Sequence, residues 1–201
     1  MSRERPPTNA VPGGTRKRWL RPLPVLLVIA LGAAVLCFAT FSAFHRGVRR
    51  AAASDFPMPA FRLPVLNAGL LAGDTTFLSS AELKGHVVLL DYWATSCKPC
   101  VAEQPLLMEL QDDYGGSGMR VVGVLENGRV ASALEWLQAH HREHFLTVMG
   151  DKKVARAGQV GGLPVTLLVD RNGQVTASFE GYSRERDPYM RQRVRELTTK
   201  R

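Results

Sequence analysis

The chain has 201 residues, which suits one domain of ordinary size together with an additional segment. Its formal net charge is +8, and all of this excess lies in residues 1–50, which hold nine Lys/Arg and one acidic residue, whereas residues 51–201 hold 17 basic and 17 acidic residues. Because a charge-balanced body offers no broad basic field to phosphates, the composition argues against nucleic-acid binding.

Residues 23–44 form an apolar run of 22 residues in which the Cys37 thiol is the only ionisable group. As a helix this run would extend about 33 Å, enough to span a hydrocarbon core of about 30 Å. More basic residues precede the run than follow it, which predicts a cytoplasmic N-terminus and an exported body. We therefore expect a cytoplasmic tail (1–22), a transmembrane anchor (23–44), a linker (45–56) and a folded domain (57–201). A cleaved signal peptide is the alternative, since AAAS at 51–54 has small residues suited to cleavage. We interpret Cys37 as a small apolar residue of the span.

From residue 57 onward, apolar runs and turn residues alternate. TTFLSSAELKGH (75–86) predicts a short strand and then a helical turn that begins at Ser79 or Ser80 and ends at Gly85. VVLLDYW (87–93) is a near-continuous apolar run, which predicts a central strand buried on both faces. Helical periodicity then continues through about Tyr114.

The second half of the domain repeats this alternation. MRVVGVL (119–125) predicts another buried strand, and ASALEWLQAHHREH (131–144) predicts a helix of a length suited to a parallel crossover into the strand LTVMG (146–150). PVTLLVDRNGQVTASFEG (164–181) predicts a hairpin with DRNG at its turn, and the tail from Pro188 predicts a closing helix. The pattern indicates an α/β fold with parallel strands first and an antiparallel hairpin at the end.

Cys97 and Cys100 lie three positions apart, directly after the strand that ends at Trp93. On a helix they would share one face and could form a disulfide. The loop that this disulfide closes is so small that it would remove little entropy from the unfolded chain, which favours a chemical over a stabilising role. A helix N-terminus and the Lys98 cation both stabilise a thiolate, and such settings lower a thiol pKa from about 8.5 towards 7 or below. Pro99 is expected to stiffen the first helical turn.

Other uses of a CxxC pair are weighed against this one. A structural zinc site needs four ligands and the chain has no second pair, while haem attachment needs His at position 101, which is Val. An inert structural disulfide remains an alternative, as do a Cu(I) carrier, because soft thiolates suit that ion, and a redox-inert binding module.

His140, His141 and His144 could present a metal-binding pair at i,i+3 or i,i+4 spacing on the predicted helix. No carboxylate or cysteine is placed to join them, so we predict no metal site. Cationic groups that interact with the C-terminal end of the helix are the more common explanation of such residues.

The segments LKGHVVLLDYWAT, LLDYWATSCKPC, VVGVLEN and GGLPVTLLVDRNGQV occur in this order, over about residues 57–183. Together with the preceding apolar run, they resemble the TlpA/ResA branch of thioredoxin-like proteins. The resemblance implies a thioredoxin-like fold, a mixed central sheet flanked by helices, preceded by one transmembrane helix. It also implies an exported, membrane-anchored thiol–disulfide oxidoreductase.

The resemblance further implies roles for the residues of the site. Cys97 would be the exposed nucleophile and Cys100 the thiol that resolves a mixed disulfide. Pro164 matches the cis-proline that packs beside the disulfide in this family, and Leu163 would offer backbone groups to an extended substrate.

Three further residues match positions of the family site. Asp91 matches the buried acid of thioredoxin, where this branch more often has Asn, and a carboxylate there could take a proton from Cys100; the alternative is an ordinary surface or strand-end Asp. Glu103 matches an acid that tunes the pair, or is merely a first-turn helix acid. Trp93 matches a tryptophan that shields the site in this family. The alternative is that it simply packs in the core. The chain departs from the family at Ser96, where Trp is common and would cover the nucleophile.

The expected function is the reduction of disulfides in substrate proteins at the periplasmic side of the inner membrane, with no cofactor besides the Cys97–Cys100 pair. The resemblance implies reductant from a membrane-embedded thiol donor of the CcdA/DsbD type. It implies as substrates the haem-site cysteines of apocytochrome c or the copper-site cysteines of a respiratory oxidase assembly protein. The residues alone do not decide whether the protein reduces or oxidises its substrates. The helix terminus and Lys98 favour the thiolate, whereas Asp91 and Glu103 oppose it.

Overall fold

The computed structural model describes residues 31–32, 55–70 and 76–199. The chain divides into two units, Met1–His45 and Arg46–Arg201, and every strand of the described residues belongs to the second. The predicted tail (1–22) and anchor (23–44) lie outside the described residues, apart from Leu31 and Gly32, which are helical. Among the residues that can be described, no helix is both long and apolar enough to cross a membrane.

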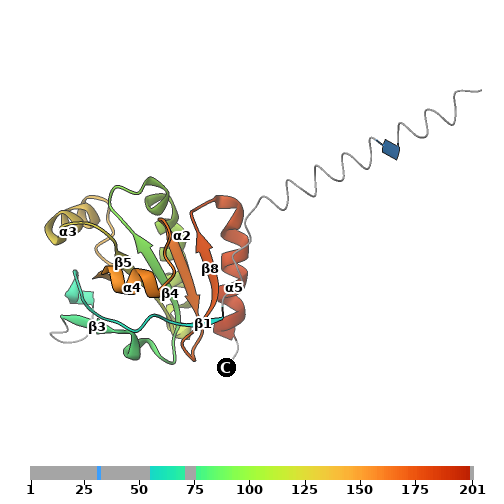
Figure 1. Cartoon of the computed structure of the whole chain (residues 1–201), viewed down its shortest axis with the longest axis horizontal. Helices are drawn as coiled ribbons and strands as arrows, with labels where there is room; N and C mark the ends of the chain where they lie inside the picture. The colour runs from blue at the N-terminus through green and yellow to red at the C-terminus, as the bar shows by residue number, and fades with distance from the viewer. Residues whose placement is uncertain (1–30, 33–54, 71–75, 200–201) are drawn as a thin grey trace, which may run out of the picture. The chain divides into compact units, whose positions relative to one another are not determined.

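Strands, helices and short 3-10 helices (η) alternate along the second unit (Figure 1). In chain order they are β1 (Phe56–Pro57), β2 (Arg62–Pro64), η1 (Ala68–Leu70), β3 (Phe77–Ser79), η2 (Ser80–Leu83), β4 (Val87–Trp93), α2 (Lys98–Tyr114), η3 (Gly115–Ser117), β5 (Met119–Leu125), α3 (Val130–Ala139), β6 (Thr147–Met149), α4 (Lys152–Ala157), β7 (Val165–Val169), β8 (Gln174–Glu180), η4 (Arg184–Arg186) and α5 (Asp187–Thr199).

The main sheet has six strands in the order β1-β8-β7-β4-β5-β6, and β2 pairs with β3 in a separate two-stranded sheet. β4, β5 and β6 run parallel, while β7 is antiparallel to both β4 and β8. The mixed sheet with parallel strands first and a hairpin at the end, which the sequence predicts, is therefore confirmed. β4 lies between β7 and β5 and is buried at all seven positions, which explains its unbroken apolar sequence.

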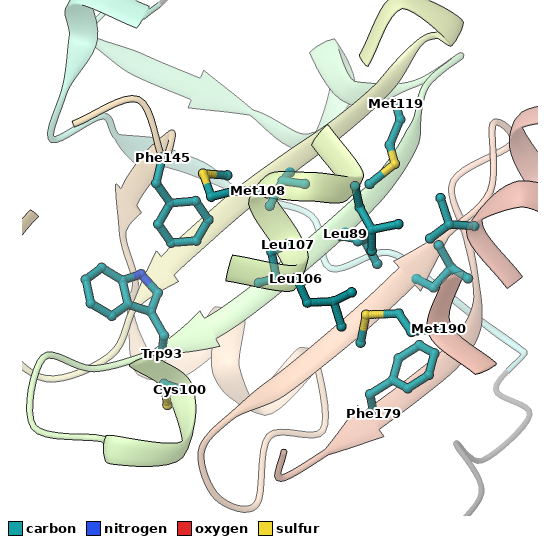
Figure 2. Close-up of a cluster of buried hydrophobic side chains, with 14 of the residues drawn as sticks. Leu89, Trp93, Cys100, Leu106, Leu107, Met108, Met119, Phe145, Phe179 and Met190 are labelled. Atoms are coloured by element: carbon teal, nitrogen blue, oxygen red, sulfur yellow. The ribbon is translucent and has the colours of Figure 1, made fainter. Parts of the chain in front are cut away.

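The side chains of β4 alternate between two cores because successive residues of a strand point to opposite faces. Leu89 and Trp93 belong to the core under α2, α3 and α5, which Figure 2 shows. Leu90 and Tyr92 belong to the core on the other face, with residues of β2, β3 and α4. Asp91 has the parity of Leu89 and Trp93, so the strand register places it on the face that α2 covers.

α3 is shorter than the sequence predicts, because it ends at Ala139 and not near residue 144. His141 adopts a left-handed backbone conformation with φ 54°, and the Arg142 amide donates to the Leu137 carbonyl at 2.7 Å. The helix therefore stops, and the expectation that His140, His141 and His144 share one helix is wrong. The described residues contain no group of His, Cys, Asp or Glu that could hold a metal ion.

Basic groups nevertheless interact with the end of α3. The His140 ring stacks on the Trp136 ring with centroids 3.9 Å apart, and its Nδ1 lies 2.8 Å from the Trp136 carbonyl oxygen. The Arg142 guanidinium donates to the carbonyls of His140 and His141. The helix-terminal role predicted for the three histidines thus applies to His140, and Arg142, which was not part of that prediction, shares it.

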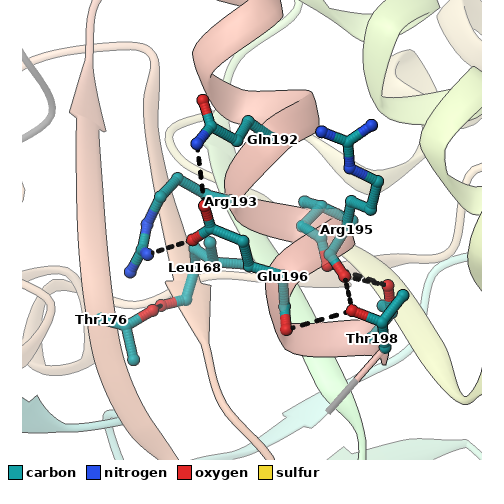
Figure 3. Close-up of polar contacts among 9 residues, drawn as sticks. Leu168, Thr176, Gln192, Arg193, Arg195, Glu196 and Thr198 are labelled. Atoms are coloured by element: carbon teal, nitrogen blue, oxygen red, sulfur yellow. Dashed lines mark hydrogen bonds and ion pairs between the residues drawn. The ribbon is translucent and has the colours of Figure 1, made fainter.

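α5 packs along the sheet and contacts α2 (Figure 1). It begins at Asp187, one residue before the predicted start, and buries Met190 and Val194 in the core. On its polar side, side chains of the same helix hydrogen-bond to one another (Figure 3). There, Gln192 and Arg193 both donate to the carboxylate of Glu196.

Candidate active site

The cysteine pair lies at the N-terminus of α2. Cys97 is the N-cap residue, and its sulfur accepts a hydrogen bond from the Cys100 amide at 3.3 Å. The two cysteines form a disulfide with their Cα atoms 5.3 Å apart. Cys97 is half-buried, whereas Cys100 is fully buried. This asymmetry gives a substrate access to the first sulfur and shields the second.

The residues around the cysteine pair differ in exposure. Ser96, Lys98 and Pro99 are exposed, with Lys98 and Pro99 in the first turn of α2. Trp93 is fully buried in the same core cluster as Cys100 (Figure 2). Its ring lies 5.3 Å from that of Trp136, centroid to centroid. Trp93 is therefore part of the core next to the site.

Pro164 follows a cis peptide bond after Leu163 and directly precedes β7. Val165 of β7 pairs with Tyr92 of β4, so the antiparallel register puts Pro164 level with Trp93, at the edge where the chain leaves β4 for Cys97. A cavity of about 330 Å³ lies beside this loop, lined by residues 161–165, 180 and 181. The fold thus brings the Leu163–Pro164 loop and the cysteine loop to one edge of the sheet.

Two acidic side chains are buried next to the pair. Asp91 is 0% exposed in β4, and Glu103 is 1% exposed one helical turn after Cys100. The hydroxyl oxygen of Thr166, the β7 residue that pairs with Asp91, lies 3.4 Å from Asp91 Oδ1 and 3.1 Å from Glu103 Oε1. The alternative of Asp91 as a surface residue is therefore wrong.

Burial raises the pKa of both carboxyl groups. For Asp91, burial and then the charge of Glu103 raise the pKa well above 3.8, although the Thr166 hydrogen bond lowers it. For Glu103, burial raises the pKa to about 7, partly opposed by the Thr166 hydrogen bond and the Arg186 cation. A carboxyl group with a pKa near 7 can accept or donate a proton at neutral pH, as thiol exchange requires.

Sequence reasoning missed Thr166 as a member of this group. The available signal was a hydroxyl residue inside the apolar strand PVTLLV. Its contact with both acids depends on the register of β7 against β4, which the sequence does not display. Gln104 was also missed: it is 1% exposed, and neither polar atom of its side-chain amide has a hydrogen-bond partner in the described part of the chain.

The chain is similar to known thiol–disulfide exchange proteins. The Redoxin family model matches residues 53–194. A thiol:disulfide interchange protein DsbE of Pseudomonas fluorescens biotype C is 30% identical over 172 residues, covering 82% of this chain and 86% of that protein. A thiol-disulfide oxidoreductase ResA of Geobacillus kaustophilus is 29% identical over 107 residues, covering 53% of this chain and 62% of that protein.

The chain is also similar to solved structures. A Chlorobium tepidum protein described as a thiol:disulfide interchange protein DsbE superposes with a TM-score of 0.63 at 27% identity, covering 74% of this chain and 99% of that one. The chain therefore belongs to the redoxin family, as a TlpA/ResA-like thiol–disulfide oxidoreductase with a thioredoxin-like fold.

Proposed function

We propose that this oxidoreductase is a membrane-anchored reductase of disulfides in extracytoplasmic substrate proteins. The observation that carries the proposal is the Cys97–Cys100 disulfide at the N-cap of α2, one turn from the buried carboxyl group of Glu103. A helix N-terminus stabilises the attacking thiolate, and a buried acid with a pKa near 7 can accept the proton of the second thiol.

In the first step the Cys97 thiolate attacks one sulfur of the substrate disulfide. A disulfide forms between Cys97 and the substrate, the substrate disulfide breaks, and its other sulfur leaves as a thiolate that takes a proton from solvent. Cys97 is suited to this step because it is half-buried and lies at the helix terminus. Backbone groups of Leu163, before the cis-proline, would hold the extended substrate chain.

In the second step Cys100 gives its thiol proton to the buried acid pair and attacks Cys97. The Cys97–Cys100 disulfide forms, and the second substrate sulfur leaves as a thiolate that takes a proton from solvent. In total the substrate gains two electrons and two protons, and the protein dithiol loses them. The reaction needs no cofactor besides the two cysteines.

The membrane part of the proposal rests on the apolar run at residues 23–44, with residues 1–22 in the cytoplasm and the folded domain in the periplasm. An oxidising compartment cannot regenerate the dithiol, so electrons must come from a membrane-embedded thiol donor, for which the CcdA/DsbD type is our proposal. The names DsbE and ResA of the relatives support thiol exchange. As substrates we propose the haem-site cysteines of apocytochrome c or copper-site cysteines in oxidase assembly.

The test is substrate trapping with the full chain carrying Cys100→Ser. Cys97 of this variant should accumulate mixed disulfides that disappear on reduction with dithiothreitol, and mass spectrometry should identify the partners. Cys97→Ser in the same background is the matched control and should trap nothing. Absence of mixed disulfides, in cells where the unmodified protein is active, would refute disulfide exchange as its function.

The direction of thiol exchange and the location of the folded domain need separate measurements. Acid quenching and thiol alkylation of cells should find the Cys97–Cys100 pair mainly as a dithiol, and as a disulfide when the membrane donor is deleted. A pair that is oxidised in both strains contradicts the reductase direction. Protease added to spheroplasts should remove the folded domain; protection of the domain contradicts the proposed topology.

A further inference from the structure

Thr166 lies between two acids but can donate only one hydrogen bond. A threonine hydroxyl carries one proton and can accept a second hydrogen bond on its oxygen. The contacts at 3.4 Å to Asp91 and 3.1 Å to Glu103 are therefore both hydrogen bonds only if one acid is protonated and donates to the hydroxyl oxygen. With both acids ionised, one buried carboxylate would have no hydrogen-bond donor among the described residues, which is costly.

Of the two acids, Asp91 is the one that we expect to be protonated. Asp91 has no cation among the causes that shift its pKa, whereas the Arg186 cation stabilises the ionised form of Glu103. At rest Asp91 then donates to Thr166, and Thr166 donates to the Glu103 carboxylate over the shorter distance. Glu103, one turn from Cys100, is left as the acid that receives the thiol proton.

A proton received by Glu103 must then reach solvent, since the side chain is 1% exposed. Tyr182, in the turn after β8, packs against the core cluster that contains Cys100, and the charges of Arg186 and Asp187 act on Glu103. Asp187 is half-buried, and its Oδ1 is buried without a hydrogen-bond partner among the described residues, as is Glu103 Oε2. Asp187 Oδ2 accepts a hydrogen bond of 3.4 Å from the hydroxyl of the half-buried Tyr182.

We propose that Thr166 joins Asp91 and Glu103 into a unit that holds one proton at rest, and that Asp187, oriented by Tyr182, exchanges the Glu103 proton with solvent. Asp187 thus connects the buried site to the surface, with one carboxylate oxygen buried and the other bound to a partly exposed hydroxyl. The charged and titratable groups that act on Glu103 are Asp91 from β4, Arg186 from η4, Asp187 from the start of α5, and Tyr182 from the turn before η4.

The reaction step that depends on this path is the attack of Cys100. The Cys100 S–H bond breaks and its proton goes to Glu103. The Cys100 thiolate forms the bond to Cys97, and the substrate sulfur leaves as a thiolate with the electron pair of the broken Cys97–substrate bond. The Glu103 proton then passes to Asp187 and to solvent, so that the site returns to one proton. The reverse reaction uses the same path inward. The inference therefore rests on thiol–disulfide exchange itself and not on the proposed reductase direction.

The test follows the Cys100 step in the reduced full chain after mixing with glutathione disulfide at pH 7, by acid quench and mass analysis of the glutathionylated intermediate. In dilute buffer, Asp187→Asn should slow loss of this intermediate by about tenfold, less than the roughly hundredfold or more that a direct acid–base group contributes. Added imidazole should restore the rate in proportion to its concentration, because a small buffer can replace the missing carboxylate. Tyr182→Phe should slow the step less and respond to imidazole in the same way.

Glu185→Gln is the matched control, because this exposed acid lies in the same turn and its removal should leave the rate unchanged. An unchanged rate in Asp187→Asn, or a slow rate that imidazole does not restore, overturns the proposed path. Thr166→Val tests the shared proton. Loss of the hydroxyl removes the hydrogen bond that lowers the pKa of Glu103, so the pH midpoint of the Cys100 step should rise. An unmoved midpoint overturns the coupling.

Discussion

Replacement of Glu103 by Gln should make the free energy of unfolding depend less on rising pH. Glu103 is buried, and its pKa is raised from 4.5 to about 7, first of all by desolvation. The folded chain therefore keeps a proton at pH values where the unfolded chain has released it. The stability that this proton provides is complete below about pH 4.5 and is lost as the pH rises through about 7. Gln is neutral at every pH and can still accept a hydrogen bond from Thr166.

The expected magnitude follows from the two pKa values. Each pKa unit corresponds to about 1.4 kcal/mol, so the step from 4.5 to about 7 corresponds to about 3 kcal/mol. The free energy of unfolding of Glu103→Gln, minus that of the unmodified protein, should thus increase by about 3 kcal/mol between pH 4.5 and pH 8. Removal of the Glu103 charge also removes a repulsion that raises the pKa of Asp91. This second effect also makes the stability of the variant fall less as the pH rises.

Guanidinium denaturation of the oxidised full chain, at half-unit pH intervals from 4.5 to 8.5, measures this difference. Glu135→Gln replaces an exposed acid on α3 and controls for the loss of one negative charge at the surface. Its difference from the unmodified protein should change little over the same range. If the Glu103→Gln difference were equally flat, Glu103 would not hold a raised pKa in the fold.

Three further outcomes are expected. Gly123→Ala should lower the free energy of unfolding by about 1 to 3 kcal/mol, because its Cβ would lie 2.8 Å from two aromatic side chains, whereas Gly116→Ala, which meets nothing within 4 Å, should be tolerated in the same denaturation series. Ser79→Ala should cost about 1 kcal/mol in that assay because it removes the capping box of η2, and no loss would contradict the cap. Lys98→Gln should raise the pH midpoint for iodoacetamide alkylation of Cys97 in the reduced protein by a few tenths of a unit, and an unchanged midpoint would show that the cation does not act on the thiolate.

The elements that the sequence predicted well are those whose burial is uniform or whose ends carry a local signal. β4 and β5 are almost wholly buried and read as apolar runs, and η2 begins at a capping serine. α4 was missed because a helix of six residues is too short for a periodic pattern, although Asp151 caps it by accepting from the Val154 amide. β1 and β2, of two and three residues, are also too short to leave a pattern.

The sequence by itself determined the cysteine spacing, the strand before it and the helix after it, because these depend on neighbours a few residues apart. It therefore placed Cys97 at a helix N-terminus and Glu103 one turn beyond Cys100. Only the tertiary structure decided that Asp91 and Glu103 share one hydroxyl, since Thr166 is 75 residues from the first and 63 from the second. The pairing of β7 with β4 places Thr166 beside Asp91, α2 carries Glu103 to the same hydroxyl, and the burial of the two acids is the largest cause of their raised pKa values.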